Sequence, residues 1–129
     1  MNILVDSSVW IDYFRSGLNS EVLDELIDNN ILCINNLILA ELVPYLNVKK
    51  QFDVIELLWE ITNIPISINW KNIIEYQSIC IKNGINKVGI PDLIILDNVI
   101  QNKLELYSLD KHFALINIVI PFGLFTINE

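Results

Sequence analysis

The chain has 129 residues, 53% of them hydrophobic, and its 16 acidic residues against 8 basic ones give a formal net charge of −8. This length fits one domain, and the hydrophobic fraction excludes a disordered chain. The apolar excess also predicts exposed apolar patches, which usually mark an interface. Because the net charge would repel a polyanion at long range, binding of nucleic acid would need positive charge close to the site.

Membrane insertion and export are not expected from this sequence. The longest uncharged stretch, residues 113–128, contains proline and glycine and falls short of the roughly 18 apolar residues that a span needs. The first six residues carry no basic region of the kind that opens a signal peptide. We therefore expect a cytoplasmic protein, in which Cys33 and Cys80 are buried thiols, because no CxxC pair and only one histidine accompany them.

Apolar spacing and capping residues predict strands that alternate with helices in the first half of the chain. In chain order we predict a strand at 2–5, a helix after Asp6 through 14, a loop at 16–20, a helix starting at Ser20, a strand at 31–34, a helix capped by Asn35 or Asn36, and a helix at 52–61. Pro44 lies in the helix capped by Asn35 or Asn36, and it should kink or break that helix near its end.

The second half continues the same alternation. It predicts a short extended segment at 64–66, a helix at 70–82, a loop at 86–90, a helix from Pro91 through 100, a strand at 104–109, a short helix at 111–115 and a strand at 124–127. Short apolar strands between helices indicate an α/β domain with a mainly parallel central sheet flanked by helices on both faces. In such sheets ligands bind at the carboxyl ends of the strands.

Four carboxylates lie in apolar stretches where a surface charge would be unusual: Asp6, Glu41, Asp92 and Asp110. Partly buried charge is costly unless a cation or hydrogen bonds satisfy it, and few basic residues are nearby, so a divalent metal is a natural partner. Simpler roles remain open for three of them. Asp6 and Asp110 could cap the helices that follow, and Asp92 could be a favourable charge in a first helical turn. Glu41 is predicted in mid-helix, where it would cap nothing.

Four short motifs, in order and spacing, resemble PIN-domain ribonucleases of the VapC toxin type: Ile3-Leu4-Val5-Asp6-Ser7-Ser8-Val9-Trp10-Ile11, Leu39-Ala40-Glu41-Leu42, Gly89-Ile90-Pro91-Asp92-Leu93-Ile94-Ile95 and Tyr107-Ser108-Leu109-Asp110-Lys111-His112-Phe113. The resemblance covers essentially the whole chain and implies one PIN-like nuclease domain over residues 1–129. It implies a metal-dependent endoribonuclease, the toxin of a type II toxin–antitoxin pair. By the same resemblance Asp6, Glu41, Asp92 and Asp110 are the catalytic residues that bind Mg²⁺ or Mn²⁺, and Ser8 is the supporting hydroxyl beside the first acid.

This chemistry agrees with the residues present. Hydrolysis of a phosphodiester needs an activated water and neutralisation of developing negative charge, and one or two Mg²⁺ ions held by carboxylates can supply both. The family often carries a further acid shortly after the fourth, where this chain has His112, which we expect to be structural or at the rim of the site. Asp97 lies five residues after Asp92, about 140° around a helix, and should be solvated and outside the site.

The resemblance also implies an RNA substrate and a cognate antitoxin protein. The acidic centre calls for a basic ligand, and the apolar segment from Leu37 to Trp59 predicts a groove for an apolar helix. The remaining apolar surface predicts a homodimer. Phosphates could be contacted by basic side chains, namely Arg15, Lys49, Lys50, Lys71, Lys87, Lys103 and Lys111.

Two other function classes remain open from sequence. One is a catalytically silent PIN-like module that binds RNA or protein. The other is a phosphate-handling α/β signalling or phosphatase domain, because such domains also begin with a strand that ends in Asp. A receiver domain would carry a pair of acids after the first strand, and a haloacid-dehalogenase-like phosphatase would carry a second acid two residues after the first. Asp6 is followed by two serines instead.

Overall fold

The computed structural model describes residues 2–15, 17 and 20–126, and its centre is one parallel sheet. The strands lie in the order β3-β2-β1-β4-β5, and each neighbouring pair is parallel. Their bounds are Ile3–Val5 (β1), Leu32–Ile34 (β2), Thr62–Asn63 (β3), Glu105–Tyr107 (β4) and Gly123–Leu124 (β5). Parallel strands all end at one edge, so the predicted parallel sheet is confirmed, with its carboxyl edge available for a site.

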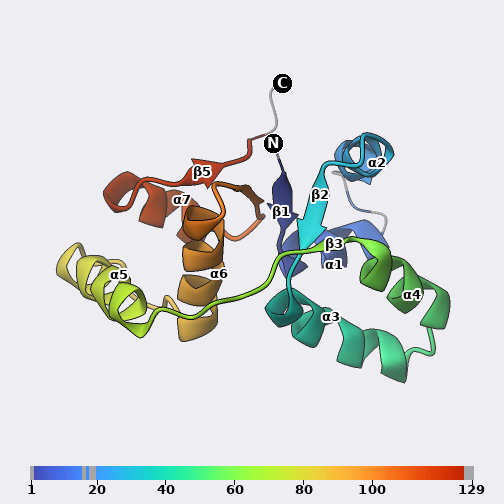
Figure 1. Cartoon of the computed structure of the whole chain (residues 1–129), viewed down its shortest axis with the longest axis horizontal. Coiled ribbons are helices and arrows are strands. Elements are labelled where there is room, and N and C mark those ends of the chain that lie inside the picture. Colours follow the sequence, from blue (N-terminus) through green and yellow to red (C-terminus); the bar gives the residue numbers. More distant parts are fainter. Residues whose placement is uncertain (1, 16, 18–19, 127–129) are drawn as a thin grey trace.

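Seven helices flank the sheet in the described part of the chain: α1 (Ser7–Phe14), α2 (Ser20–Asp28), α3 (Asn36–Val48), α4 (Phe52–Glu60), α5 (Trp70–Lys82), α6 (Ile90–Gln101) and α7 (Lys111–Val119). They form two groups. The contacts α1·α2, α1·α3 and α3·α4 join the first group, and α5·α6 and α5·α7 join the second. Figure 1 shows these groups on opposite sides of the strands. The expected α/β architecture is therefore confirmed.

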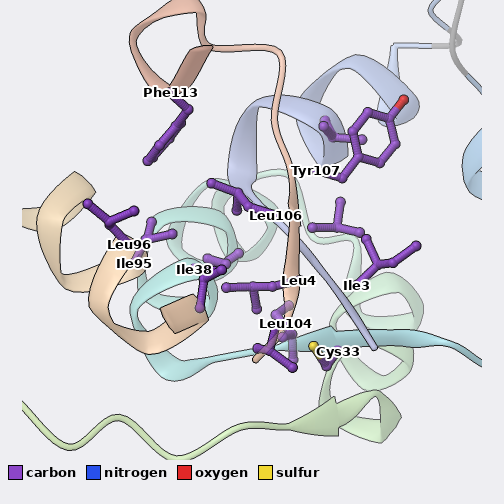
Figure 2. Close-up of a cluster of buried hydrophobic side chains, with 14 of the residues drawn as sticks. Ile3, Leu4, Cys33, Ile38, Ile95, Leu96, Leu104, Leu106, Tyr107 and Phe113 are labelled. Atoms are coloured by element: carbon purple, nitrogen blue, oxygen red, sulfur yellow. The ribbon is translucent and has the colours of Figure 1, made fainter. Parts of the chain in front are cut away.

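The core lies where the central strands meet the inner faces of the helices. Leu4 of β1 and Leu106 of β4 have no exposed surface, which explains why β1 is an unbroken apolar run and why β4 is apolar after Glu105. Figure 2 shows Ile38 of α3 and Leu96 of α6 in the same cluster. Cys33 of β2 is buried there too, and burial raises the pKa of its thiol to about 12.

Helix α3 differs from its prediction at Pro44. We expected a kink or a break at Pro44, and the break is wrong, because the helix continues through Pro44 to Val48. Proline removes the bond to the carbonyl of Ala40, but Ala40 is exposed, so water can satisfy that carbonyl. Leu42 and Leu46, on either side of the proline, are both buried and hold the helix against the core. Packing therefore outweighs the local preference.

The chain also differs from prediction near its end. Helix α7 runs to Val119 rather than stopping at 115, because Phe113 and Ile116 are both buried on its inner face. The last strand is Gly123–Leu124, and residue 127 of the predicted strand lies outside the described residues, as do 16, 18 and 19 of the predicted loop. Both cysteines are free and buried, as predicted. None of the described helices is long and apolar enough to cross a membrane.

Candidate acidic site

The site begins where β1 and β4 end side by side. Register pairs Val5 with Tyr107, so the next residues, Asp6 and Ser108, leave the sheet together. The Asp6 backbone N–H donates to the Tyr107 carbonyl at 3.0 Å, which continues the ladder by one step. Only 5% of Asp6 is exposed. A carboxylate this buried needs donors close by.

Two serine hydroxyls satisfy the Asp6 carboxylate. Ser8 donates to Asp6 Oδ1 from its hydroxyl at 2.5 Å and from its backbone N–H at 2.6 Å. Ser108 donates its hydroxyl to Asp6 Oδ2, also at 2.5 Å. Each hydroxyl in turn accepts a backbone N–H, from Leu109 at 2.9 Å and from Asp110 at 3.0 Å respectively. The serines therefore fix both Asp6 and the backbone that leads to Asp110.

Ser108 was not predicted from the sequence as a site residue. Ser8 was, because it stands two residues after the first acid, and the structure places its hydroxyl on Asp6. The sequence does show a hydroxyl residue directly after β4. It points to the site only when β4 is known to pair with β1, and the sequence does not give the order of the strands in the sheet.

Asp110 caps helix α7 and contacts the only histidine. Its Oδ1 accepts the His112 backbone N–H at 2.9 Å and lies 2.8 Å from His112 Nδ1. The two side chains are 36% and 38% exposed. His112 thus lies at the rim of the site and bonds to one of the four acids, as expected of a structural or rim residue.

Asp92 stands in the first turn of α6, and its Oδ2 accepts the Gly89 backbone N–H at 3.3 Å. Burial raises the pKa of Asp92, and the negative charges of Asp110 and Asp6 raise it further. The Gly89 hydrogen bond and the charge of His112 oppose that rise. Asp92 therefore lies within electrostatic reach of two other acids from distant parts of the chain.

Glu41 joins the group from helix α3. Burial raises the pKa of Glu41, and the charges of Asp6 and Asp92 add to the rise, while a hydrogen bond with Ser7 opposes it. The structure thus brings the four predicted acids to the carboxyl edge of the sheet, where their charges act on one another. The expected partial burial is confirmed for Asp92 and Asp110 and exceeded by Asp6, whereas Glu41 is the one acid of the four that is largely exposed.

Three of the four acids also lie at helix N-termini. Asp6 caps α1, Asp110 caps α7, and Asp92 lies in the first turn of α6. The capping roles that the sequence left open are therefore correct, and they coexist with a shared acidic site. The partial positive charge of three helix N-termini offsets some of the repulsion between the carboxylates.

The donors of this site are carboxylate and hydroxyl oxygens, the ligand type that hard divalent cations prefer. As they stand in the structure, no three His, Cys, Asp or Glu side chains of the described residues form a group that could hold a metal ion. Mg²⁺, however, is usually held by one or two carboxylates and keeps several waters, so an open set of oxygen donors suits it. Burial is the main cause of the raised pKa values of Glu41 and Asp92, and the neighbouring carboxylates add to it, so a cation at this edge would favour the ionised form of both groups.

Asp97 corrects a prediction. It is 2% exposed rather than solvated, and its carboxylate accepts from Asn72 Nδ2 at 3.2 Å, from the Tyr76 hydroxyl at 3.3 Å and from Gln101 Nε2 at 2.6 Å. Two of these donors belong to α5, which packs on α6. The charge of Asp97 is not among those that act on Asp92 or Glu41, so it serves the α5–α6 contact.

Two grooves lie along helix α1, and one of them is lined by an acid of the site. One, of about 230 Å³, lies between α1 and α3; its lining includes Ile11, Arg15, Glu41 and Tyr45. The other, of about 350 Å³, is mainly apolar and lies between α1, α2 and α4; its lining includes Trp10, Tyr13, Ile27, Val54, Leu57 and Leu58. We call them the Glu41 groove and the Leu57 groove. The predicted apolar segment from Leu37 to Trp59 contributes to both.

Comparison with known proteins agrees with this architecture. The family model described as the PIN domain matches residues 3–118. The fold is similar to VapBC2 from Rickettsia felis, bound to a DNA fragment from its promoter, with a TM-score of 0.77, 18% identity, and coverage of 99% of this chain and 100% of that one. It is similar to DNA-bound VapBC from Salmonella typhimurium, with a TM-score of 0.76, 13% identity and 97% coverage of both chains.

A third similar structure is VapC20 from Mycobacterium tuberculosis, described as a toxin that cleaves the sarcin–ricin loop. Its TM-score is 0.62 at 12% identity, with coverage of 88% of this chain and 94% of that one. A search of curated protein sequences finds no match.

Proposed function

The chain belongs to the PIN-domain family, and on that premise we propose that it is a metal-dependent endoribonuclease that acts as the toxin of a toxin–antitoxin pair. One observation carries the proposal. Asp6, Glu41, Asp92 and Asp110 come from four separate segments, and the fold gathers them at the carboxyl edge of the parallel sheet. Gathering like charges is costly, which favours a functional reason for it.

The residues of the site divide the work between them. Asp6 is held rigidly by the hydroxyls of Ser8 and Ser108, so it would present its carboxylate in one fixed orientation. Asp92 and Glu41, from α6 and α3, would complete the donor set from the two sides. When bound, Mg²⁺ or Mn²⁺ would supply activation of water and neutralisation of the charge on the phosphoryl oxygens. His112 holds Asp110 at the solvent rim.

Cleavage of RNA by the purified chain tests the proposal. We expect structured RNA to be cut when Mn²⁺ or Mg²⁺ is supplied, and EDTA or Asp110→Asn to abolish cutting while the circular dichroism spectrum stays unchanged. The amide can still accept the His112 N–H, so helix α7 keeps its cap. Since the RNA target is unidentified, growth arrest on expression is measured in parallel. Arrest that persists in all four acid-to-amide variants would refute the enzyme and favour a catalytically silent PIN module.

The proposed regulator is a cognate antitoxin. An apolar helix of that partner would dock in the Leu57 groove, and a Lys- or Arg-bearing segment would extend through the Glu41 groove to the acids. Exposed apolar side chains on α3 and α4 support this placement, with Tyr45 58%, Leu57 62% and Trp59 59% exposed. Two of the similar structures are VapBC complexes, which makes a partner of this kind reasonable for the present fold.

We also propose that the chain forms a homodimer. Apolar residues are exposed on the second group of helices as well, at Trp70, Ile74 and Ile81 of α5 and at Ile118 of α7. Helices α5 and α7 line neither the Glu41 groove nor the Leu57 groove, so the dimer contact and the antitoxin contact can form at the same time. Sedimentation equilibrium measures the assembly directly, and a monodisperse monomer at micromolar concentration would contradict it.

A further inference from the structure

A buried pair of asparagines links the two helices that bring Glu41 and Asp92 to the site. Asn35 has no exposed surface and Asn98 is 3% exposed. Asn35 Nδ2 donates to Asn98 Oδ1 at 3.0 Å, while Asn35 Oδ1 accepts the Ile38 backbone N–H at 2.9 Å and so caps α3. Asn98 Nδ2 donates to the Pro65 carbonyl at 3.1 Å. Each of these side-chain atoms therefore has a partner, as a buried amide requires.

On each of the two helices, the asparagine of the pair is separated from the acid by the same number of residues. Glu41 follows Asn35 by six residues on α3, and Asp92 precedes Asn98 by six residues on α6. Six residues correspond to about 9 Å of helix. The charge of Asp92 acts on Glu41, so the amide link and the acid pair are two separate places where residues of α3 and α6 come near each other.

Little else ties these helices together directly. Helix α3 packs mainly on α4 and α1, whereas α6 packs mainly on α5 and β4. Ile38 of α3 and Leu96 of α6 belong to the same core cluster, but apolar contacts allow small rotations that a hydrogen bond with fixed geometry resists (Figure 2). A 10° swing of α3 about the link would move a group 9 Å away by roughly 1.5 Å, and displacements of about 1 Å can cost 100-fold in rate.

We propose that the Asn35–Asn98 pair positions Glu41 against Asp92, and that it thereby sets how well the acidic site holds a divalent cation. The inference rests on the proposed function, because it assigns the pair a task at that site. Asn35 and Asn98 are positioning residues, since they touch none of the four acids. Their action passes through the helix axes.

The test separates the link from the helix cap. Asn35→Ser keeps a side-chain oxygen that can cap α3 but removes the donor to Asn98. Asn69→Ser is the matched control, because Asn69 caps α5 through Asn72 N at 3.1 Å, lies on the surface, and belongs to a helix that carries none of the four acids. We expect the dissociation constant for Mn²⁺, measured by calorimetry, to rise about tenfold in Asn35→Ser. Less than a twofold rise is expected in Asn69→Ser.

A double variant distinguishes positioning from plain stability. Asn35→Ser alone leaves the Asn98 side-chain oxygen unpaired. Asn35→Ser/Asn98→Ala removes that unpaired oxygen but also the bond from Asn98 to the Pro65 carbonyl, so part of the lost melting temperature should return. The link is still absent, so Mn²⁺ binding should remain about tenfold weaker. Recovery of Mn²⁺ affinity together with stability would overturn the proposal. The same comparison decides the matter if Asn35→Ser alone does not fold.

The backbone amide NMR signals of Glu41 and Asp92 provide a readout that needs neither metal nor activity. Both signals should shift in Asn35→Ser and stay in place in Asn69→Ser. Shifts confined to the neighbours of residues 35 and 98, with Mn²⁺ affinity unchanged, would overturn the positioning role. If the wild type neither binds Mn²⁺ nor cuts RNA, the proposed function fails. The amide signals then still decide whether the pair fixes the two acids.

Discussion

Three carboxylates in this protein serve the helix that follows and the shared site at the same time. Asp6 and Asp110 each accept a backbone N–H two residues ahead, and Asp92 accepts one three residues behind. An amide oxygen can accept the same bond, but it carries no charge. Acid-to-amide variants therefore separate the two roles: they keep the caps and remove the charges that a cation would need.

Metal binding is expected to stabilise the wild type through these charges. A ligand that binds only the folded state raises its stability, so 5 mM Mg²⁺ or Mn²⁺ should raise the melting temperature by several degrees. Asp6→Asn and Asp92→Asn remove a donor and should show little shift. Differential scanning fluorimetry with and without EDTA measures the effect. Equal shifts in all three proteins would mean that the cation binds elsewhere.

Burial of Glu41, with repulsion from the other acids added to it, predicts a pH dependence of stability. The pKa of Glu41 is raised above its ordinary value of 4.5 in the folded state, so ionising this group costs folding free energy. The cost is absent below the unfolded-state pKa and is complete above the folded-state pKa. In EDTA, Glu41→Gln should therefore match the wild type near pH 4 and melt higher than it at pH 7. A variant that melts lower at pH 7 would show that Glu41 is stabilised as an anion.

The four acids could be predicted from sequence because each stands alone in apolar sequence. Other polar residues could not be assigned this way, since their roles depend on which elements meet. Ser108 matters because β4 pairs with β1, and Asp97 is buried because α5 supplies its donors. The angle of about 140° around the helix correctly predicted that Asp97 lies away from Asp92 and outside the site. It could not show that helix α5 covers the face of α6 on which Asp97 lies.

Helix and strand boundaries followed local signals where these were strong. Helix α5 has the predicted bounds, because Asn69 caps its start and Asn83-Gly84 ends it. Helix α3 continues past Pro44, because a buried side chain beyond the proline holds its last turns against the core. Helix α7 continues past residue 115, because a buried side chain follows there as well, although the apolar pattern in the sequence is short. Packing of this kind is absent from any local window of sequence.

The contact between α5 and α6 should depend on Asp97. Asp97→Ala would remove the acceptor of the Asn72 amide and the Tyr76 hydroxyl, so we expect a loss of about 2–4 kcal/mol of unfolding free energy. Urea denaturation measures this loss. The control Glu56→Ala removes an exposed acid from α4 and should change stability by less than about 0.5 kcal/mol. A comparable small change in Asp97→Ala would mean that water replaces the carboxylate.

At the scale of the whole molecule, charge and apolar surface are segregated in a way that suits a basic, partly apolar partner. The acids gather at one edge of the sheet, and the Glu41 groove connects that edge to apolar surface on α1 and α3. Arg15 is among its lining residues, so the groove is not uniformly negative. A net charge of −8 would speed the approach of a basic segment and slow the approach of RNA.

Inhibition and complex formation by the proposed antitoxin should therefore separate. If its apolar helix supplies most of the binding free energy, replacing its basic residue near Asp6 and Glu41 by Ala should restore RNA cleavage while the complex persists. On this chain, Leu57→Asp places a charge in the Leu57 groove and should weaken the complex about 30-fold or more, as loss of an interface hot spot does. Cleavage by the free Leu57→Asp protein should stay intact, because the residue is remote from the acids.

Leu115→Asp is the matched control for that experiment. Leu115 is 48% exposed on α7, lines neither groove and is not among the residues of the proposed dimer surface, so the same change should leave antitoxin affinity unaltered. Both affinities are measured by titration of the labelled partner under conditions that keep cleavage silent, with EDTA present. Equal weakening by Leu57→Asp and Leu115→Asp would place the partner elsewhere. If inhibition survives the loss of the antitoxin's basic residue, charge pairing with the four acids contributes nothing measurable to inhibition. The partner would then inhibit by covering the site.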